Sequence, residues 1–587
     1  MKSQICAALF AVSALTVACS SESSLPPYGQ VQGWNILSDS YDDALVTLAA
    51  AREYNVNHLQ LSHHLIMDLR EIREPERRAK VTSLIDRAHE AGIPEVVLWD
   101  HALYGLDYYP EEFKTGPDGT INLDNPEFWE WFRADYRQML DLVPSADGLV
   151  LTFIETGTRA ERQYSEKWST GPEKLAAVVD CVADVVCREY GKKLYVRTFA
   201  YTDAEYANTI GCLEHVRSRE IILMMKETPH DFFLTHPNDK YAGTIDRPTI
   251  IEFDTGGEFN GQGIITNTWP EYVLGRWSRY VRLPNIIGYV ARTDRYGNTR
   301  LVGTPNEILL DALKSYTADT TVTADRVYDS FISRKYGPAA VDVLKPAFQL
   351  AFDIVTSSLY TLGTNTANHS ALNYDPYRSS YARHVSGKWI DPPIAHIRHG
   401  VDRDFHYWKD VIEHLAPARL KTADGPIRTE APAVIDSSWV TPVERMNEDY
   451  LKWIITEKQY GVKLAEQALQ MVESSKGVLE QPDYLQLTAL FGRTLLTARL
   501  HEAAATAYWG YRIYARGEDY RTPWLKQTLS DALERMTTVA DEIERFGHPI
   551  PVGQWNWQKD AQMVSQYYEW ITQGWPEYGN VRFITHQ

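Results

Sequence analysis

Positive charge is scarce in this sequence of 587 residues, where 59 Lys and Arg stand against 78 Asp and Glu and the formal net charge is −19. No run of basic residues of the kind that binds phosphates is present, so we expect no nucleic-acid partner. An acidic ligand is still compatible with this balance wherever local cations receive it. Cysteine is also scarce, with five in the chain. After the N-terminal pair, Cys181, Cys187 and Cys212 allow at most one disulfide.

Long apolar runs are missing from the sequence. Beyond the N-terminus, no apolar run reaches the roughly 18 residues of a membrane-spanning helix. Residues 1–27 combine Lys2, an apolar stretch and a Ser-rich spacer, the features of an export signal. Within them, LTVAC resembles a bacterial lipoprotein cleavage box, which would make Cys19 the lipidated first residue of the mature chain. We therefore expect an exported protein, periplasmic or at the outer membrane or cell surface, that contacts a membrane only through a lipid anchor. Secretion without the anchor is the alternative.

Apolar residues are plentiful, at 44% with 17 Trp and 35 Tyr, and they supply material for two or three domain cores. From about residue 30, strand-like runs alternate with helical patterns such as RAKVTSLIDRAHEAG. The strand-like runs are QGWNIL (32–37), NHLQLS (57–62), EVVLWD (95–100), GLVLTFIE (148–155), KLYVRTFAY (193–201), EIILMMKE (220–227), TIIEFD (249–254) and IIGYVART (286–293). Eight repeats predict an α/β fold closed as a (β/α)8 TIM barrel over residues 28–340. A doubly wound open sheet is the rival, although no GxGxxG follows the first strand.

The strand pattern ends after about residue 305, and long helical patterns take its place. LKWIITEKQYGVKLAEQALQMV and LKQTLSDALERMTTVADEIERFG are two of them. They predict a mainly α-helical C-terminal region over residues 341–587. This region is also the candidate surface for a homodimer.

Charged side chains follow the predicted strands at the ends where barrel enzymes carry their active sites. The residues concerned, on strands four to seven, are Glu155, Arg197, Lys226, Asp231, Glu252, Asp254 and Glu258. Glycoside hydrolysis needs such a set, because one protonated carboxyl donates to the leaving oxygen while a carboxylate activates water or attacks the sugar. A guanidinium buried in an apolar strand, as at Arg197, also requires an anionic partner.

Further candidates lie beside these carboxyl groups. Asp100 and His101 follow strand three, where we expect them to bind sugar hydroxyls, and Trp269 could stack on a sugar face or pack the barrel. The His and Asp residues of strands two and three lack the HxH or HExxH spacing of common zinc sites, so we expect neither a metal nor another cofactor.

At these residues the chain resembles the α-glucuronidases of glycoside hydrolase family 67. ILMMKETPHDFF followed by RPTIIEFDTGGEFNGQG resembles the family's two central motifs, a lysine-bearing strand that leads to a catalytic aspartate and a next strand that leads to a catalytic glutamate. LDNPEFWEWFRADYRQMLDLVPSADGLVLTFIETG resembles the approach to the family's catalytic acid, and YVRTFAY resembles its arginine strand. The resemblance covers roughly residues 30–340.

The resemblance implies roles for particular residues. Glu155 would be the general acid, and Asp231 and Glu258 would hold and deprotonate the attacking water. Arg197 and Lys226 would bind the carboxylate of the sugar. Glu252 and Asp254 would support these groups around the substrate. The family inverts anomeric configuration, which requires roughly 6.5 to 9.5 Å between acid and base.

Two features depart from the family. No N-terminal β domain precedes the barrel, and Leu151 or Thr152 stands where the family carries a second lysine. We expect an exported glycoside hydrolase that removes a uronic acid, α-linked glucuronic acid or its methyl ether, from polysaccharide-derived oligosaccharides by an inverting mechanism. A metal-assisted barrel hydrolase and a non-catalytic glycan-binding surface lipoprotein are the alternatives.

Overall fold

The computed structural model describes most of the chain from residue 26 onward. Cys19 and the rest of the export signal lie outside the described residues. The described residues are 26–200, 203–228, 231–234, 238–239, 241–361, 364–365, 370, 372, 421–422, 425–426, 447–546, 557–576 and 579–584.

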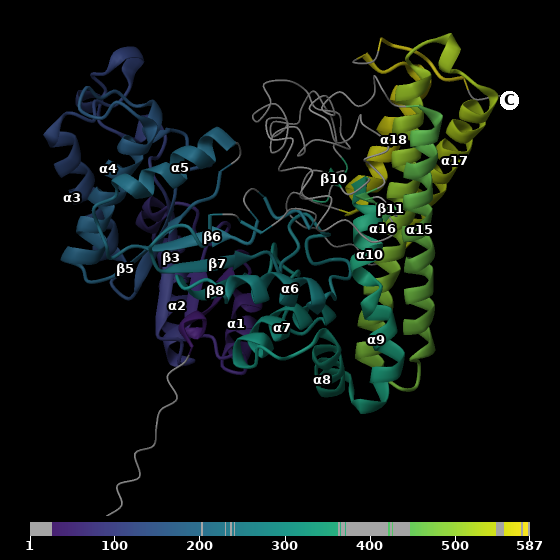
Figure 1. Cartoon of the computed structure of the whole chain (residues 1–587), viewed down its shortest axis with the longest axis horizontal. Helices are drawn as coiled ribbons and strands as arrows, with labels where there is room; N and C mark the ends of the chain where they lie inside the picture. Colours follow the sequence, from purple (N-terminus) through teal and green to yellow (C-terminus); the bar gives the residue numbers. More distant parts are fainter. Residues whose placement is uncertain are drawn as a thin grey trace, which may run out of the picture.

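A closed barrel of eight parallel strands forms the N-terminal part of the structure, which confirms the predicted fold (Figure 1). Each strand pairs with its neighbours in chain order, and β1 closes the ring by pairing with β8. The strands are β1 (Val31–Ile36), β2 (His58–Leu61), β3 (Glu95–His101), β4 (Gly148–Thr152), β5 (Lys193–Arg197), β6 (Ile222–Lys226), β7 (Thr249–Phe253) and β8 (Ile286–Arg292).

Helices cover the outside of the barrel, and several begin where the sequence supplies a cap. Ser40, Asn125 and Thr170 each accept a hydrogen bond from a main-chain N–H of the first helical turn, which satisfies a donor that the helix itself leaves open. The helices are α1 (Tyr41–Ala51), α2 (Pro75–Glu90), α3 (Pro126–Leu142), α4 (Gly171–Ala183), α5 (Asp203–His215), α6 (Pro270–Tyr280), α7 (Ile308–Ala318) and α8 (Ala324–Tyr336). The described part of the β6–β7 connection contains no helix.

The C-terminal region is helical, as the sequence predicts, and its long helices stand beside the barrel (Figure 1). The elements are α9 (Val341–Gln349), α10 (Ala351–Ser358), α15 (Glu448–Ser474), α16 (Gln481–Tyr514), α17 (Pro523–Arg545) and α18 (Trp557–Gln573), with the two-residue strands β9 (Tyr360–Thr361), β10 (Thr364–Asn365), β11 (Lys421–Thr422) and β12 (Gly425–Pro426). In the described part of the chain, no helix combines the length and the apolar character needed to cross a membrane.

The helical region braces the loop that follows β7. Arg493 on α16 donates from Nε to the carbonyl of Ile264 at 2.7 Å, and the next residue, Thr494, accepts from the N–H of Thr266 at 3.1 Å. Because these buried side chains satisfy main-chain groups of the loop, the loop takes its shape partly from a helix more than two hundred positions away in the chain.

A buried lysine makes a second connection. Lys458 on α15 is 1% exposed and donates to three main-chain carbonyls around the end of α10, including that of Tyr360. These carbonyls satisfy the ammonium group away from water. The hydroxyl of Tyr360 in turn donates to Asn260 at 2.8 Å and accepts from the N–H of Leu234 at 3.0 Å. The helical region therefore supports both of the loops that follow β6 and β7.

Candidate active site

The interior of the barrel changes from apolar to charged along the strands. Alternate residues of a strand face inward, and one interior layer packs Trp99, Tyr195, Met224, Ile250 and Val290 into an apolar cluster. Two positions further along the same strands, toward their C-terminal ends, stand His101, Arg197, Lys226, Glu252 and Arg292, all buried. The change occurs at the end of the barrel where active sites are built.

Glu252 lies at the centre of this layer between two arginines. Arg197 donates to it from Nε at 2.7 Å and from Nη2 at 3.3 Å, and Arg292 donates from Nη2 at 2.8 Å. Burial alone would raise the pKa of Glu252, but Arg197 and Arg292 outweigh burial and lower it. The expected anionic partner of Arg197 is thus Glu252. Both groups are engaged with each other, which leaves them in supporting positions beneath the rim.

Lys226 and Asp231 form a second buried pair, with Nζ donating to Oδ1 at 2.6 Å. The ammonium also lies 3.6 Å from the ring centre of Phe199 and 4.0 Å from that of Phe232. Burial is the largest influence on Lys226 and lowers its pKa. Since ring faces attract a cation, the aromatic side chains hold the ammonium in place while Asp231 pairs with it.

Glu258 lies on the glycine-rich loop after β7 and is held by two cations. Arg292 Nη1 lies 2.5 Å from Oε2, and Arg295 Nη2 lies 2.8 Å from Oε1. The loop needs glycine at Gly257, which has φ +70° and where an added Cβ would lie 2.3 Å from the side-chain oxygen of Asn267. Glycine therefore lets this loop turn sharply and carry Glu258 back over the barrel.

Glu155 lies beyond the end of β4 and is about one third exposed, at 32% of its side chain. Its φ of +65° is unusual for a residue other than glycine. Burial tends to raise its pKa, but His101, Arg197 and Lys226 together bring the pKa of Glu155 down to about 2. The free site therefore holds Glu155 as a carboxylate, whereas a general acid must carry a proton.

His101 lies close to Glu155, with Nε2 3.9 Å from Oε2. Its Nδ1 lies 2.8 Å from the carbonyl of Met67 and 3.3 Å from Asp68. Burial would lower the pKa of the imidazole, but Asp68 and Glu155 raise it to about 9. His101 thus lies as a buried imidazolium between two carboxylates.

Asp254 shows the opposite behaviour to Glu155. Burial raises its pKa to about 7, and the negative charges of Glu258 and Glu227 act in the same direction against Arg292. Its Oδ2 accepts from the N–H of Glu258 at 2.7 Å, while Oδ1 is buried without a hydrogen-bond partner. Asp254 therefore shapes the β7 loop and carries a proton under mildly acidic conditions.

Arg295 is the main residue of this site that the sequence analysis missed. It is 5% exposed, and its Nε and Nη1 are buried without hydrogen-bond partners, so only part of its guanidinium is used on Glu258. Nearby His63 has a pKa well below its ordinary value because of burial and the charges of Arg292 and Arg295. Arg292 lies at the end of the eighth predicted strand and Arg295 just after it, and these positions could have indicated that both belong to the rim.

Two residues predicted to bind substrate are buried and contact other protein side chains. Asp100 is fully buried and accepts hydrogen bonds from the N–H of Leu69 and the hydroxyls of Tyr104 and Tyr136, and burial raises its pKa to about 6. Trp269 is 3% exposed and packs edge-on against Phe352 at 5.9 Å. In this structure both side chains hold the fold around the site and present no open face to a sugar.

The described residues contain no group of three or more His, Cys, Asp and Glu side chains arranged to hold a metal ion. Asp100 and His101, the candidates for such a role on β3, have the protein partners given above. The free cysteines Cys181, Cys187 and Cys212 lie elsewhere, on and near α4 and α5.

Comparison with known proteins finds likeness in structure and not in sequence: no protein-family model and no curated protein matches the chain. A family 138 glycoside hydrolase that targets pectin rhamnogalacturonan II is similar with a TM-score of 0.55 at 12% identity, over 92% of this chain and 68% of that one. A family 115 4-O-methyl-α-glucuronidase with specificity for decorated arabinogalactans reaches a TM-score of 0.45 at 8% identity, over 92% and 62%. An O-GlcNAc hydrolase mutant from Thermobaculum terrenum reaches 0.43 at 9%, over 92% and 94%.

These structural neighbours are glycoside hydrolases. The likeness to the family 138 enzyme, at 12% identity, is a likeness of fold. Only the first likeness has a TM-score high enough to bear on the fold, and it agrees with the barrel and helical region described above.

Proposed function

We propose that the protein is an exported glycoside hydrolase that removes a uronic acid, α-linked glucuronic acid or its methyl ether, from polysaccharide-derived oligosaccharides. The observation that carries the proposal is a barrel rim that combines carboxyl groups with a buried guanidinium, Arg295, that has donors to spare. Carboxyl groups supply acid and base for glycoside hydrolysis. A guanidinium in need of acceptors supplies a partner for an acidic sugar.

The structure changes which cation is best suited to bind the sugar carboxylate. The family 67 resemblance assigns this role to Arg197 and Lys226, but these are paired with Glu252 and Asp231. Arg295 keeps two nitrogens unpartnered in a buried setting, where an unmet donor is costly. A carboxylate placed there would satisfy them. We therefore assign first contact with the uronate to Arg295, with Arg197 and Lys226 contributing charge from below.

The charge of the substrate also bears on the proton donor. Glu155 is ionised in the free site because of His101, Arg197 and Lys226. A uronate bound beside these cations would offset their field, and the pKa of Glu155 would rise toward the range of a general acid. An acidic substrate thus helps to protonate the carboxyl that acts on it. A neutral sugar would leave Glu155 ionised.

Asp231 and Glu258 are the proposed water-activating carboxylates, as the family 67 resemblance implies. Each is held in place by a cation, Asp231 by Lys226 and Glu258 by Arg292 and Arg295. A fixed carboxylate can orient a water molecule for attack from the face opposite the leaving group, which gives inversion.

Turnover of a substrate panel tests the proposal. The purified protein would be incubated with aldouronic acids from glucuronoxylan, with pectin-derived uronides and with neutral xylo-oligosaccharides as the control, and the released sugar followed by NMR. We expect free uronic acid, released first as the β-anomer from an α-linkage, and no product from the neutral set. Sugar binding without any turnover would replace the hydrolase with a glycan-binding protein, and loss of turnover on chelation would indicate a metal-assisted reaction.

Export remains part of the proposal. The signal-like residues 1–27 and the LTVAC segment support cleavage before Cys19 and attachment of a lipid there. A lipid anchor would hold the enzyme at the surface where large polysaccharide fragments arrive. Labelling of cells with a fatty-acid analogue tests this, because Cys19→Ala should abolish incorporation into the protein.

A further inference from the structure

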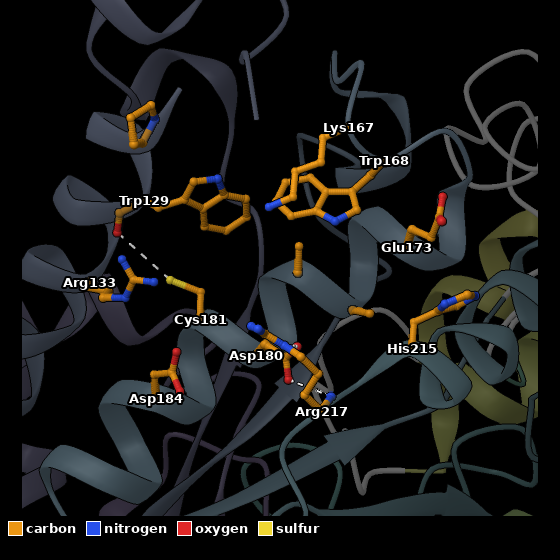
Figure 2. A pocket seen from close by; sticks show the side chains of 13 residues that line it. Trp129, Arg133, Lys167, Trp168, Glu173, Asp180, Cys181, Asp184, His215 and Arg217 are labelled. Carbon is orange, nitrogen blue, oxygen red and sulfur yellow. Dashed lines mark hydrogen bonds and ion pairs between the residues drawn. The ribbon is translucent and has the colours of Figure 1, made fainter. Parts of the chain in front are cut away.

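A cleft of about 490 Å³ lies on the outer wall of the barrel, and none of its lining residues belongs to the charged rim. It runs between α3, α4 and the residues that follow α5, and Figure 2 shows its labelled side chains. The size falls within the range of pockets that hold small ligands. The side chains that line it are Pro126, Trp129, Arg133, Lys167, Trp168, Glu173, Ala176, Ala177, Asp180, Cys181, Asp184, His215 and Arg217.

Two half-exposed indoles border one side of the cleft, opposite Asp180 and Arg217 (Figure 2). Trp129 on α3 and Trp168 before α4 meet edge to face, with ring centres 5.7 Å apart at 84°. Two alanines of α4 also line the space. Small residues beside large aromatic surfaces leave room for a flat ligand such as a sugar ring, whose C–H groups pack on indole faces.

The acidic side chains of the cleft are already satisfied by the protein. Glu173 accepts from the N–H groups of Ser169 and Thr170 at the start of α4. Asp180 accepts from the main chain and side chain of Arg217. Asp184 is paired with Arg188 on the next turn at 2.7 Å. Because these carboxylates already have hydrogen-bond or ion-pair partners in the protein, we expect them to attract a cationic ligand only weakly.

The basic side chains are less fully used. Lys167 makes no ion pair within the described residues, and its Nζ lies 4.4 Å from the ring centre of Trp168 (Figure 2). Among the described residues, the one acidic group within 4.0 Å of Arg133 is Glu130, at 3.8 Å, which is beyond hydrogen-bond distance. Two available cations beside two indoles suit a ligand that has both sugar faces and negative charge.

We propose that this cleft is a second binding site, separate from the catalytic rim, for a segment of an acidic polysaccharide. The inference rests on the proposed function for the identity of the polymer, and its geometry is independent of the rim. The connection from β4 to α4 carries Glu155 near its start and Lys167 and Trp168 near its end. A polymer held in the cleft would therefore be attached next to the loop that carries the proposed acid.

Affinity electrophoresis tests the site directly, because retardation in a gel requires binding but no turnover. The full-length protein would be run through native gels that contain polygalacturonate, glucuronoxylan or neutral galactan. We expect retardation by at least one acidic polymer and none by galactan. Lys167→Glu combined with Arg133→Glu, and separately Trp168→Ala, should weaken the apparent affinity at least tenfold.

The matched control is Trp524→Ala, because Lys452 lies over that indole at 5.1 Å in the same way but outside the cleft. Activity on a small aryl uronide should be unchanged in all cleft variants, which would also show that they fold. Retardation that survives in the cleft variants but is lost in Arg295→Ala would place polymer binding at the rim and overturn the inference, as would no retardation by either acidic polymer. Loss of retardation in the cleft variants of a protein without turnover would uphold the cleft and refute the hydrolase.

Discussion

The end of β4 and the loop after β7 have opposite effects on the pKa of a carboxyl group. At the end of β4, His101 and the arginine and lysine below keep Glu155 ionised, with a pKa of about 2. After β7, burial beside Glu258 and Glu227 raises the pKa of Asp254 to about 7. Glu155 is the more exposed of the two as a candidate donor, while Asp254 has one oxygen buried and the other bound to the main chain.

This contrast shows that the resting pKa alone does not identify the general acid. The group with the convenient pKa, Asp254, is engaged in holding its loop, and the group with access, Glu155, is ionised until the charge around it changes. On the proposed function, binding of an anionic sugar is that change. The assignment of roles therefore depends on the charge of the substrate as much as on the protein.

The largest expected effect is on kcat/KM, and its dependence on the leaving group of the substrate should distinguish Glu155 from Asp254. Glu155→Gln should lower kcat/KM by about 10²- to 10⁴-fold on natural uronides with poor leaving groups, and by far less on a 4-nitrophenyl uronide that needs no proton. Asp254→Asn should affect both substrates to a similar degree because it disturbs the loop. Steady-state kinetics on the two substrates gives the comparison. The reverse pattern would make Asp254 the acid.

A smaller effect is expected at the proposed uronate contact. Arg295→Ala should reduce kcat/KM on a glucuronide about 100-fold, as for a charged hydrogen bond lost from a buried site, and should change the much slower reaction of the matching glucoside little. Arg282→Ala, on an exposed arginine beyond α6, is the matched control. If Arg295→Ala damages both sugars equally, Arg295 acts only by holding Glu258.

The loop after β7 should lose more stability on substitution of a glycine than a turn where the added atom has free space. Gly257→Ala places a Cβ against Asn267 at a positive φ and should reduce the free energy of unfolding by about 3 kcal/mol or more. Gly191→Ala has a similar φ of +64° with nothing within 4 Å of the added atom, so it should cost only about 1 kcal/mol. Chemical denaturation of both variants measures the difference. Equal losses would mean that the loop yields around Asn267.

The smallest expected effect is in the pH dependence of stability, where the two carboxyl groups have opposite signs. The folded pKa of Asp254 is raised from 3.8 to about 7, so its contribution is present at low pH and lost as pH rises through that window. The folded pKa of Glu155 is lowered from 4.5 to about 2, so its contribution is present above pH 4.5 and lost as pH falls.

In Asp254→Asn, Tm should therefore decrease less than in wild type as pH rises from about 4 to 7. In Glu155→Gln, Tm should decrease less than in wild type as pH falls below 4.5. Thermal melts across this range measure both slopes. Profiles parallel to wild type in both variants would show that neither group is shifted as described.

The order of the elements was predictable because it depends on local patterns. All eight predicted strands are present, with ends that differ by a few residues. The pattern AAVDVLKPAFQLAFDIV reads as one helix but forms two, α9 and α10, with Pro346 inside the first. The sequence shows no amphipathic period over α16, although this helix is 34 residues long, because Ala, Thr and Gly are spread around it and most of its surface is buried.

The candidate site was predictable in position and less so in its pairings. Charged residues at strand ends indicate the rim, and the pairing of Arg197 with an acid followed from its burial. Which acid it meets depends on how the strands are offset around the barrel, where Arg197 is registered with Met224, and Glu252 with Lys226 and Val290. The free donors of Arg295 depend on how a loop outside any periodic element turns, and no local pattern encodes that.

The contacts from α15 and α16 to the β6 and β7 loops also govern the order in which the molecule can be completed. The chain is made from its N-terminus, and the ring of strands has all its parts once residue 292 has emerged. Arg493 and Thr494, which hold Ile264 and Thr266, follow about 200 residues later, roughly 10 to 40 s at ordinary rates of synthesis. Until then the loop that carries Glu258 lacks its brace. A newly made barrel can therefore close before this loop has the contacts that shape it, and the loop gains them only when α16 packs against it.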